Sequence, residues 1–423
     1  MSAERGLPRL LHGIEGGATL SLAQHLRVHG ALETSGRDAG ARLLDVIEDS
    51  GLRGRGGAHV SSALKLRAVA GRRRRAVVVA NGSESEPASR KDALLLTHTP
   101  HLVIDGALVA ATAVGADEVV LYVKRSDPRV WAAVLHAVDE RRATGAREPA
   151  LRVVAAPSSY VSGQETAAIA HLNGKPALPA TVPPRPFERG VGNRPTLVSN
   201  VETLAHMALI ARHGADWFRA VGSSTQPGSV LVTLGGAVAR PGVYEIASAS
   251  PMADLLRAAG GVSERPQALL VGGYGGAWLD AQHLQDLTLS EGDPLLAAGS
   301  IGAGVLWVLG EGSCGVWESA RVLDYLAEQS AGQCGPCLYG LRAIADSFDL
   351  VARGAREDQR ARLRRWGTEV PARGACRHPD GAARLLTSAL EVFAREIDGH
   401  RAGRCSGVHA PSMPLGTAAR AAA

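Results

Sequence analysis

The chain has 423 residues, more than one hydrophobic core ordinarily serves, so two or three domains are expected. Hydrophobic residues make up 45% and charged residues 21%, a balance typical of globular proteins. The net charge is +5, but much of the excess lies in local runs near residues 72–75 and 360–365, and aromatic residues make up only 4%. These features exclude a nucleic-acid-binding protein and favour a docking face for an acidic redox partner.

The sequence contains no apolar stretch of the length that a membrane span requires. The longest runs, at 77–80 and 305–309, fall far short of the roughly 20 residues needed. The N-terminal segment also lacks the apolar run and cleavage site of a signal peptide. We therefore expect a cytoplasmic protein without a transmembrane segment, either free or peripheral to a membrane complex.

Short β-rich runs alternate with helical patterns from residue 40 to about residue 215. This alternation predicts an α/β layer with a largely parallel sheet, in which ligands bind beyond the carboxyl ends of the strands. Polar loops at 81–87 and 157–164 follow the first and third of the predicted strands. The strands are predicted at 76–80, 118–123 and 151–156, and helices near 102–114 and 129–143.

The rest of the chain changes character twice. Residues 228–300 contain two strands around a Gly/Pro turn, a short helix and a further strand, which indicates a small β-rich α+β unit. From Ser313 onward, apolar residues recur at three- and four-residue spacing with short connections, which predicts an up-down four-helix bundle. Its helices are expected at 314–328, 338–353, 356–366 and 380–398.

A glycine-rich segment at 51–57 leads into a predicted helix that starts near Ser61. Free backbone amides and the positive end of a helix dipole favour a phosphate group there, and Lys65 can add a cation. Alone, this pattern is equally typical of a flexible surface loop.

Three further segments carry polar side chains at the start of a predicted helix. The first, 80–92, suits ribityl or ribose hydroxyls and the edge of a heterocycle, although alone it also fits a solvated acidic turn. The other two, 160–176 and 195–218, are interpreted as loops that enter helices. The polar residues are Asn81, Ser83, Glu84 and Glu86 in the first segment, and Gln164, Glu165, Ser199 and Asn200 in the other two.

Four sequence blocks together resemble one family. GLRGRGGA, NGSESEP with the following Lys91-Asp92, YVSGQETA and PTLVSNVETL are similar, in order, to the NADH-binding flavoproteins of bacterial NADH-quinone oxidoreductase (complex I) and their relatives in NAD-linked hydrogenases and formate dehydrogenases. The resemblance covers about residues 40–400. It implies a Rossmann-like FMN- and NAD-binding domain at 1–222, a β-grasp (soluble-ligand-binding) domain at 223–305, an iron–sulfur-binding helical bundle at 306–402 and a flexible tail at 403–423.

The resemblance also implies the site residues. Glu165 would lie next to the flavin and shape the field around the nicotinamide, which makes it the catalytic candidate, and Glu86 would also lie at the nicotinamide nucleotide. The FMN phosphate and ribityl chain would be cradled by Gly54, Arg55, Gly56, Gly57 and Lys65, and the site completed by Asn81, Ser83, Glu84, Gly163, Gln164, Ser199 and Asn200.

The chain departs from the family where aromatic side chains stack on the NADH bases. The family's GAGFPTGLKW and KPPF are replaced by segments that carry Val60 and Arg185. Stacking on an aromatic ring contributes roughly 1–3 kcal/mol per base in comparable settings, so weaker NADH binding is expected. Arg185 offers instead a guanidinium for stacking or for the extra phosphate of NADPH.

The five cysteines favour metal rather than disulfides in a chain without a secretory signal. Cys334 and Cys337 have C-x-x-C spacing, and Cys376 follows 376 − 337 = 39 residues later. This resembles the [4Fe-4S] pattern of the family, whose remaining cysteine is Ala331 here.

The order of the predicted helices places the three cysteines at one end of the bundle. Cys314 and Cys405 would lie at the other end, roughly 20 Å away at 1.5 Å per residue, where unligated thiols are the preferred interpretation. The alternatives for the cluster are a non-cysteine ligand such as His378, a three-iron (3Fe-4S) cluster, a distant cysteine delivered by an unexpected chain path, or an empty vestige.

The resulting expectation is an NAD(P)H dehydrogenase-like flavoprotein that takes electrons from NAD(P)H or another two-electron donor. The electrons would pass through FMN and the cluster to a protein acceptor, such as a ferredoxin-like subunit, a reductase or a larger complex. The alternative is a regulatory or binding module that kept the fold and lost nucleotide turnover.

Overall fold

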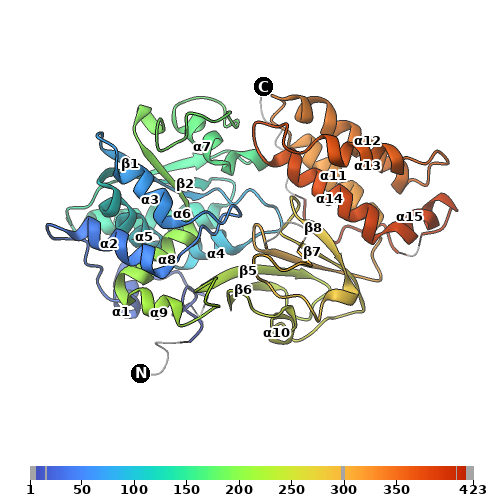
Figure 1. Cartoon of the computed structure of the whole chain (residues 1–423). Helices are drawn as coiled ribbons and strands as arrows, with labels where there is room; N and C mark the ends of the chain where they lie inside the picture. Colours follow the sequence, from blue (N-terminus) through green and yellow to red (C-terminus); the bar gives the residue numbers. More distant parts are fainter. Residues whose placement is uncertain (1–5, 15–16, 297–300, 406, 416–423) are drawn as a thin grey trace.

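The computed structural model describes residues 6–14, 17–296, 301–405 and 407–415. Figure 1 shows an α/β unit in blue to green, a second sheet in yellow-green to yellow, and a group of helices in orange to red. The mixed α/β architecture with a parallel sheet agrees with the sequence prediction.

The first sheet has four parallel strands in the order β3-β2-β1-β4. The valine-rich run of β1 is buried on both faces, as expected for a central parallel strand. Val78 and Ala80 pack into one core, whereas Val77 and Val79 pack into another on the opposite face. The strands are β1 (Ala76–Gly82), β2 (Ala116–Lys124), β3 (Ala150–Ala156) and β4 (Thr196–Asn200).

The helices of this unit include those predicted and several that were not. The predicted helix near Ser61 is α3, and Ser61 caps it by accepting a hydrogen bond from the Leu64 amide. The predicted helices near 102–114 and 129–143 are α5 and α6, whereas α1, α2, α4 and α9 lacked a clear pattern. The α-helices are α1 (Leu22–His29), α2 (Ala39–Ser50), α3 (Ser62–Ala70), α4 (Lys91–His98), α5 (Pro100–Val114), α6 (Pro128–Ala143), α7 (Glu165–Leu172), α8 (Val201–His213) and α9 (Ala215–Arg219), with short 3-10 turns η1 (Tyr160–Gly163) and η2 (Val191–Asn193).

Helix α5 is apolar on nearly all sides and almost wholly buried, which is typical of a core helix. It begins with Pro100 in its first turn and ends at Gly115 in the left-handed conformation. Within the described residues, no single helix is long and apolar enough to cross a membrane; α4 and α5 reach that length only together and are bent by 98°.

The second sheet has five strands in the order β6-β5-β9-β7-β8, with β5 and β9 parallel and the other pairs antiparallel. Helix α10 (Met252–Ala258) packs its apolar side chains against it. The last strand in sequence, β9, lies between β5 and β7, so the sheet extends past the expected boundary at residue 305 to Gly310. The strands are β5 (Ser229–Gly236), β6 (Gly242–Ala247), β7 (Pro266–Val271), β8 (Ala277–Asp280) and β9 (Val305–Gly310), with η3 (Ala281–His283) after β8.

The C-terminal helices pack on one another, and α14 also contacts β8. The helix predicted at 380–398 is two helices, α14 and α15, that break at Phe393. Phe393 is buried against Trp278 and against Gly315, where a β-carbon would lie 2.1 Å from its ring. The elements are α11 (Gly315–Glu328), the π turn η4 (Pro336–Gly340), α12 (Leu341–Ala352), α13 (Arg360–Glu369), α14 (His378–Val392) and α15 (Ala394–Arg401).

The segment after α15 differs from the flexible tail expected at 403–423. The Val408 amide donates to the Gly312 carbonyl at 2.9 Å, and the Ser412 amide donates to Glu318 at 2.6 Å. Met413 is 1% exposed within the core of the helical unit. Residues 407–415 are therefore packed, while residues 406 and 416–423 of the expected tail lie outside the described residues.

Candidate functional site

The polar segments predicted from the sequence meet at the carboxyl ends of β1 and β4. Asn81 of β1 pairs with Asn200 of β4, and Ala80 pairs with Ser199. The strand order runs from β1 outward to β3 on one side and to β4 on the other, so these strands flank the topological switch point where ligands bind in such sheets.

The segment at 196–200 is a strand rather than the loop expected from the sequence. Ser199 lies inside this strand and is 8% exposed. Asn200 ends the strand and caps α8, because its side chain accepts a hydrogen bond from the Glu202 amide at 3.0 Å.

The glycine-rich loop is closed and lies against this edge. The Gly54 amide donates to the Val60 carbonyl at 2.8 Å, and Gly57 has a positive φ of 95°. A β-carbon added to Gly56 would lie 3.3 Å from the Asn200 β-carbon. The loop thus brings backbone amides next to the end of β4.

Lys65 joins the loop helix to two other segments. Its ammonium donates to the Val198 carbonyl at 2.9 Å and lies 3.4 Å from the Glu165 carboxylate. The Lys65 and Glu165 side chains are 36% and 33% exposed. A cation and a carboxylate therefore stand side by side at the accessible edge of the sheet.

The loop after β1 packs tightly against η1. Asn81 donates from its amide nitrogen to the Gly163 carbonyl at 2.8 Å. A β-carbon on Gly163 would lie 2.6 Å from the hydroxyl oxygens of both Ser83 and Ser85. The neighbouring Gln164 caps α7, accepting from the Thr166 and Ala167 amides, and so fixes the start of that helix.

Arg55 faces away from the other predicted phosphate contacts. Its side chain is buried and donates to the Ser229 carbonyl of β5 at 2.9 Å, while its backbone amide donates to Thr203 at 2.8 Å. Burial lowers the pKa of its guanidinium. The guanidinium binds the loop to the second sheet instead of pointing toward the expected phosphate.

Glu84 also serves its own segment. Its carboxylate accepts hydrogen bonds from the Ser89 hydroxyl at 2.6 Å and from the first amides of α4, at Asp92 and Ala93. Burial raises the pKa of Glu84, and the neighbouring Asp92 raises it further. The side chain thus caps α4 and shapes the loop that carries Asn81 and Ser83.

Glu86 is 8% exposed and reaches the second sheet unit. It accepts hydrogen bonds from the Tyr160 hydroxyl at 3.0 Å and from the Tyr274 amide at 2.9 Å. Burial raises the pKa of Glu86 to about 7. Its carboxyl group therefore joins two units of the molecule, and Glu165 is the more exposed of the two predicted nucleotide-side carboxylates.

A buried charge network beneath the site was not predicted. The Lys91 ammonium lies 2.7 Å from Asp92 and 2.9 Å from Glu202, and Asn200 donates to Asp92 at 2.6 Å. Burial lowers the pKa of Lys91, but the two carboxylates outweigh it and raise the pKa overall. The Lys91-Asp92 pair belonged to a recognised sequence block, but spacing alone gave no sign that it lies under Asn200.

The positions that lack the family's aromatic side chains are open to solvent. Val60 is 46% exposed, Leu64 is 66% exposed and Arg185 is also exposed. Val60 and Leu64 flank the helix start that carries Lys65.

Cys334, Cys337 and Cys376 form one group of interacting thiols. Cys337 lies on the π turn before α12, and Cys376 lies just before α14. Burial raises the pKa of the Cys337 thiol, and the adjacent Cys334 and Cys376 raise it further. His378 Nε2 lies 2.8 Å from the Leu326 carbonyl, which can only accept, so Nε2 carries the proton of the neutral ring and Nδ1 carries none.

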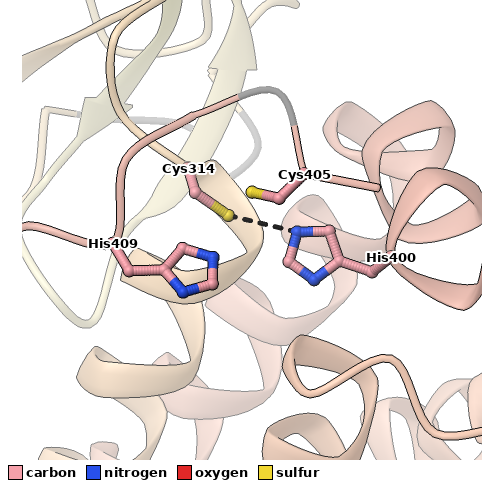
Figure 2. Close-up of side chains that lie close together, drawn as sticks. All are labelled: Cys314, His400, Cys405 and His409. Atoms are coloured by element: carbon pink, nitrogen blue, oxygen red, sulfur yellow. Dashed lines mark hydrogen bonds between the residues drawn. The ribbon is translucent and has the colours of Figure 1, made fainter. Parts of the chain in front are cut away.

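Cys314 and Cys405 lie at the other end of α11, as predicted. Cys314 caps the start of α11, whereas Cys334 and Cys337 follow its end. Cys314 and Cys405 meet each other together with His400 and His409 (Figure 2). Neither is therefore placed to complete the group at Cys334, Cys337 and Cys376.

Comparison with known proteins agrees with this arrangement. Family models match residues 47–209 (Nuo51 FMN-binding domain), 231–275 (SLBB domain) and 318–400 (NADH-ubiquinone oxidoreductase-F iron-sulfur binding region). The NADH-quinone oxidoreductase-F polypeptide of Mycobacterium tuberculosis is 32% identical over 379 residues, covering 85% of each chain. That of Aquifex aeolicus is 28% identical over 417 residues, covering 94% of this chain and 96% of the relative.

Two further relatives belong to hydrogenases. The NADP-reducing hydrogenase subunit HndC of Solidesulfovibrio fructosivorans is 28% identical, and the match covers 85% of this chain and 76% of the relative. A chain of an H2-reduced NAD+-reducing [NiFe]-hydrogenase superposes with a TM-score of 0.81 at 29% identity, covering 94% of this chain and 67% of that chain. The order of the three matched regions and the extent of the similarity show that this chain belongs to the NADH-quinone oxidoreductase-F family.

Proposed function

We propose that this chain is an FMN-dependent oxidoreductase that accepts electrons from NAD(P)H and passes them through FMN and an iron–sulfur cluster to a protein acceptor. The observation that carries the proposal is the meeting of four distant segments at the switch point between β1 and β4. The printed functions of the relatives, which reduce quinone or NADP, support the same chemistry.

The residues at this edge fit FMN. Lys65 keeps a half-exposed ammonium beside the start of α3, where a phosphate would gain both the helix dipole and a cation. Gly54, Gly56 and Gly57 leave the backbone approachable, and a side chain at Gly163 would collide with its neighbours. Bound FMN would supply the conversion between two-electron and one-electron transfer. The polar residues proposed to hold its ribityl chain and ring are Asn81, Ser83, Gln164, Ser199 and Asn200, with Glu84 and Arg55 supporting the loops.

The nucleotide side of the site is proposed to use Glu165. This carboxylate is a third exposed and lies beside Lys65, whereas the carboxylate of Glu86 accepts hydrogen bonds from Tyr160 and Tyr274. Arg185 is exposed where the family has a stacking aromatic side chain, which favours a role in binding a nucleotide phosphate. The same replacement supports the second candidate function, a binding module without nucleotide turnover.

The cluster is proposed to be held by Cys334, Cys337 and Cys376, as a 3Fe-4S cluster or as a 4Fe-4S cluster with a further ligand. Among the residues named as alternatives, His378 is the one adjacent to this group, and its Nδ1 is buried without a hydrogen-bond partner. Such a group fits a cation because burial and mutual repulsion disfavour its free thiolates.

The acceptor is proposed to dock beside the π turn that carries Cys337. Leu338 and Tyr339 on this turn are 51% and 76% exposed, which suits a partner such as a ferredoxin-like subunit or a reductase. We assign residues up to 222 to the FMN domain, the five-stranded sheet through Gly310 to a β-grasp domain, and the helices α11–α15 to the cluster domain. The five cysteines are free of disulfides, in keeping with a cytoplasmic location.

The proposal is tested by cofactor analysis of the full chain purified without oxygen. We expect about one FMN released per chain on denaturation, together with iron and acid-labile sulfide. A colourless protein without flavin and iron after expression under iron-replete conditions would overturn the redox function. A protein that holds flavin but is reduced by neither NADH nor NADPH would establish the binding module instead.

A further inference from the structure

Four metal-binding side chains from three parts of the chain converge at the end of the helical unit remote from Cys334, Cys337 and Cys376. Cys314 caps α11, His400 lies in the last turn of α15, and Cys405 and His409 follow α15. Figure 2 shows the two sulfur atoms and the two imidazole rings turned toward a common centre. We propose that these residues bind one zinc ion, which fastens the C-terminal segment to the helical unit.

The distances fit a mononuclear site. One potential ligand atom from each residue lies within 4.8 Å of every other, and the Cys314 sulfur lies 3.3 Å from His400 Nε2. Tetrahedral zinc with bonds of about 2.3 Å to sulfur and about 2.0–2.1 Å to nitrogen places its ligand atoms roughly 3.3–3.8 Å apart. The four side chains need only small shifts to close around one ion. A two-iron centre would separate the cysteine pair from the histidine pair, which the mutual proximity of all four disfavours.

The surroundings fix His400 in the form that binds a metal. Its Nδ1 lies 2.7 Å from the Ala352 carbonyl, which can only accept, so Nδ1 carries the proton of the neutral ring. Nε2 then presents its lone pair to the Cys314 sulfur. A histidine ligand held by a hydrogen bond from its other nitrogen is the usual arrangement in zinc sites.

The two other sides of the site are also ordered. The Cys314 sulfur accepts a hydrogen bond from the Trp317 amide at 3.2 Å. The His409 ring stacks on the Trp317 ring, with centroids 5.7 Å apart and planes within 5°. Two thiolates and two imidazoles are the ligand set of structural zinc, and both thiol protons would be released on binding.

The position of the site indicates a structural role. The segment that supplies Cys405 and His409 continues into the packed residues described above, where the Ser412 hydroxyl also accepts a hydrogen bond from the Trp307 indole of β9 at 3.1 Å. Cys314 lies directly after β9 and His400 ends the last helix. One ion would therefore fasten the second sheet, the helices and the C-terminal segment together.

The test is metal analysis of the full chain and of two pairs of variants. We expect about one zinc per chain in addition to iron. Cys405→Ser should lose zinc and keep iron, while Cys376→Ser should lose iron and keep zinc. His409→Ala should weaken zinc binding by more than the roughly 10–100-fold that follows loss of an outer hydrogen bond, whereas the exposed His136→Ala should leave it unchanged.

A second measurement uses Co2+ added to the chelator-treated protein. Bands of tetrahedral thiolate-bound Co2+ are expected in the parent and absent from Cys405→Ser, and the C-terminal segment of the parent should resist a protease until zinc is removed. The proposal is overturned if the parent binds neither zinc nor Co2+, or if Cys405→Ser and His409→Ala retain parental zinc affinity. It is also overturned if iron occupies the site and is lost with Cys405.

Discussion

Lys65 is the residue that most directly links the parts of the proposed FMN site. Its ammonium contacts the Val198 carbonyl next to the end of β4 and the Glu165 carboxylate at the start of α7. The glycine-rich loop leads directly into its helix. A phosphate bound at the start of α3 would therefore meet this cation.

Lys65→Met should weaken FMN binding. A hydrogen bond to a charged group contributes roughly 1.5–3 kcal/mol, so the dissociation constant should rise by about 10- to 100-fold. Fluorescence titration of the flavin-free protein measures this change. Lys175→Met, at an exposed position on the loop after α7, is the matched control, and equal FMN affinity in the two variants would contradict the assignment.

Glu86 gives the fold a dependence on pH. Burial raises its pKa from 4.5 to about 7, so the folded protein binds this proton more tightly than the unfolded chain does. The stability that this group contributes is then present at low pH and is lost as pH rises from about 4.5 through about 7, by about 3 kcal/mol in total.

Glu86→Gln should remove that contribution to the slope. Its amide oxygen can still accept from the Tyr274 amide, and it cannot ionise. Urea unfolding at a series of pH values should therefore show the free energy of unfolding of the parent falling relative to that of the variant between pH 5 and 8. A parallel pH dependence in both proteins would show that Glu86 titrates normally.

At the scale of elements, the sequence predicted those helices and strands that have long or strongly periodic apolar patterns. The strand β4 was missed because it has only five residues and ends in Ser199 and Asn200, which resemble the polar start of a loop. The directions of Arg55 and Glu86 could not be predicted, because their partners lie 174 and 188 residues away. Sequence motifs thus located the segments of the site, whereas tertiary contacts decided which side chains face it.

The pair α5 and α8 depends on one close approach. A β-carbon on Gly106 would lie 1.7 Å from the Leu204 carbonyl oxygen, so the helices could not keep their separation. Both helices pack over β1 and carry the start of the site at Asn200.

Gly106→Ala should therefore destabilise the protein by at least the roughly 1–3 kcal/mol typical of overpacking, measured by urea unfolding. Gly71→Ala is the control, because Gly71 has a negative φ of −73° and the nearest atom to an added β-carbon is 3.6 Å away. An equally mild effect of both substitutions would mean that the two helices can separate without cost.

The cysteine group depends on the loops at one end of the helices. Cys334 and Cys337 come from the connection between α11 and α12, and Cys376 from the connection between α13 and α14. Cys376→Ser should remove most of the iron without removing FMN, because the flavin site lies in the first unit. Iron and flavin analysis measures both, and full iron retention would contradict this cluster site.

At the scale of the whole molecule, buried polar contacts join the three units. Glu202 accepts from the Leu231 amide of β5 at 2.9 Å, and the Trp278 amide of β8 donates to Ser388 of α14 at 2.9 Å. The Tyr160 ring, beside Glu86, lies 5.4 Å from the ring of His378, two residues from Cys376. The proposed flavin edge and the cysteine group are therefore linked by continuous packing, which suits electron transfer between them.

The central claim is tested most directly by adding NADH, and separately NADPH, to the full chain under anaerobic conditions. Visible absorption follows the flavin, and electron paramagnetic resonance follows the cluster. We expect at least one nucleotide to bleach the flavin and to produce the signal of a reduced iron–sulfur cluster. A protein that contains both cofactors, is fully reduced by dithionite and is left oxidised by both nucleotides would contradict the account.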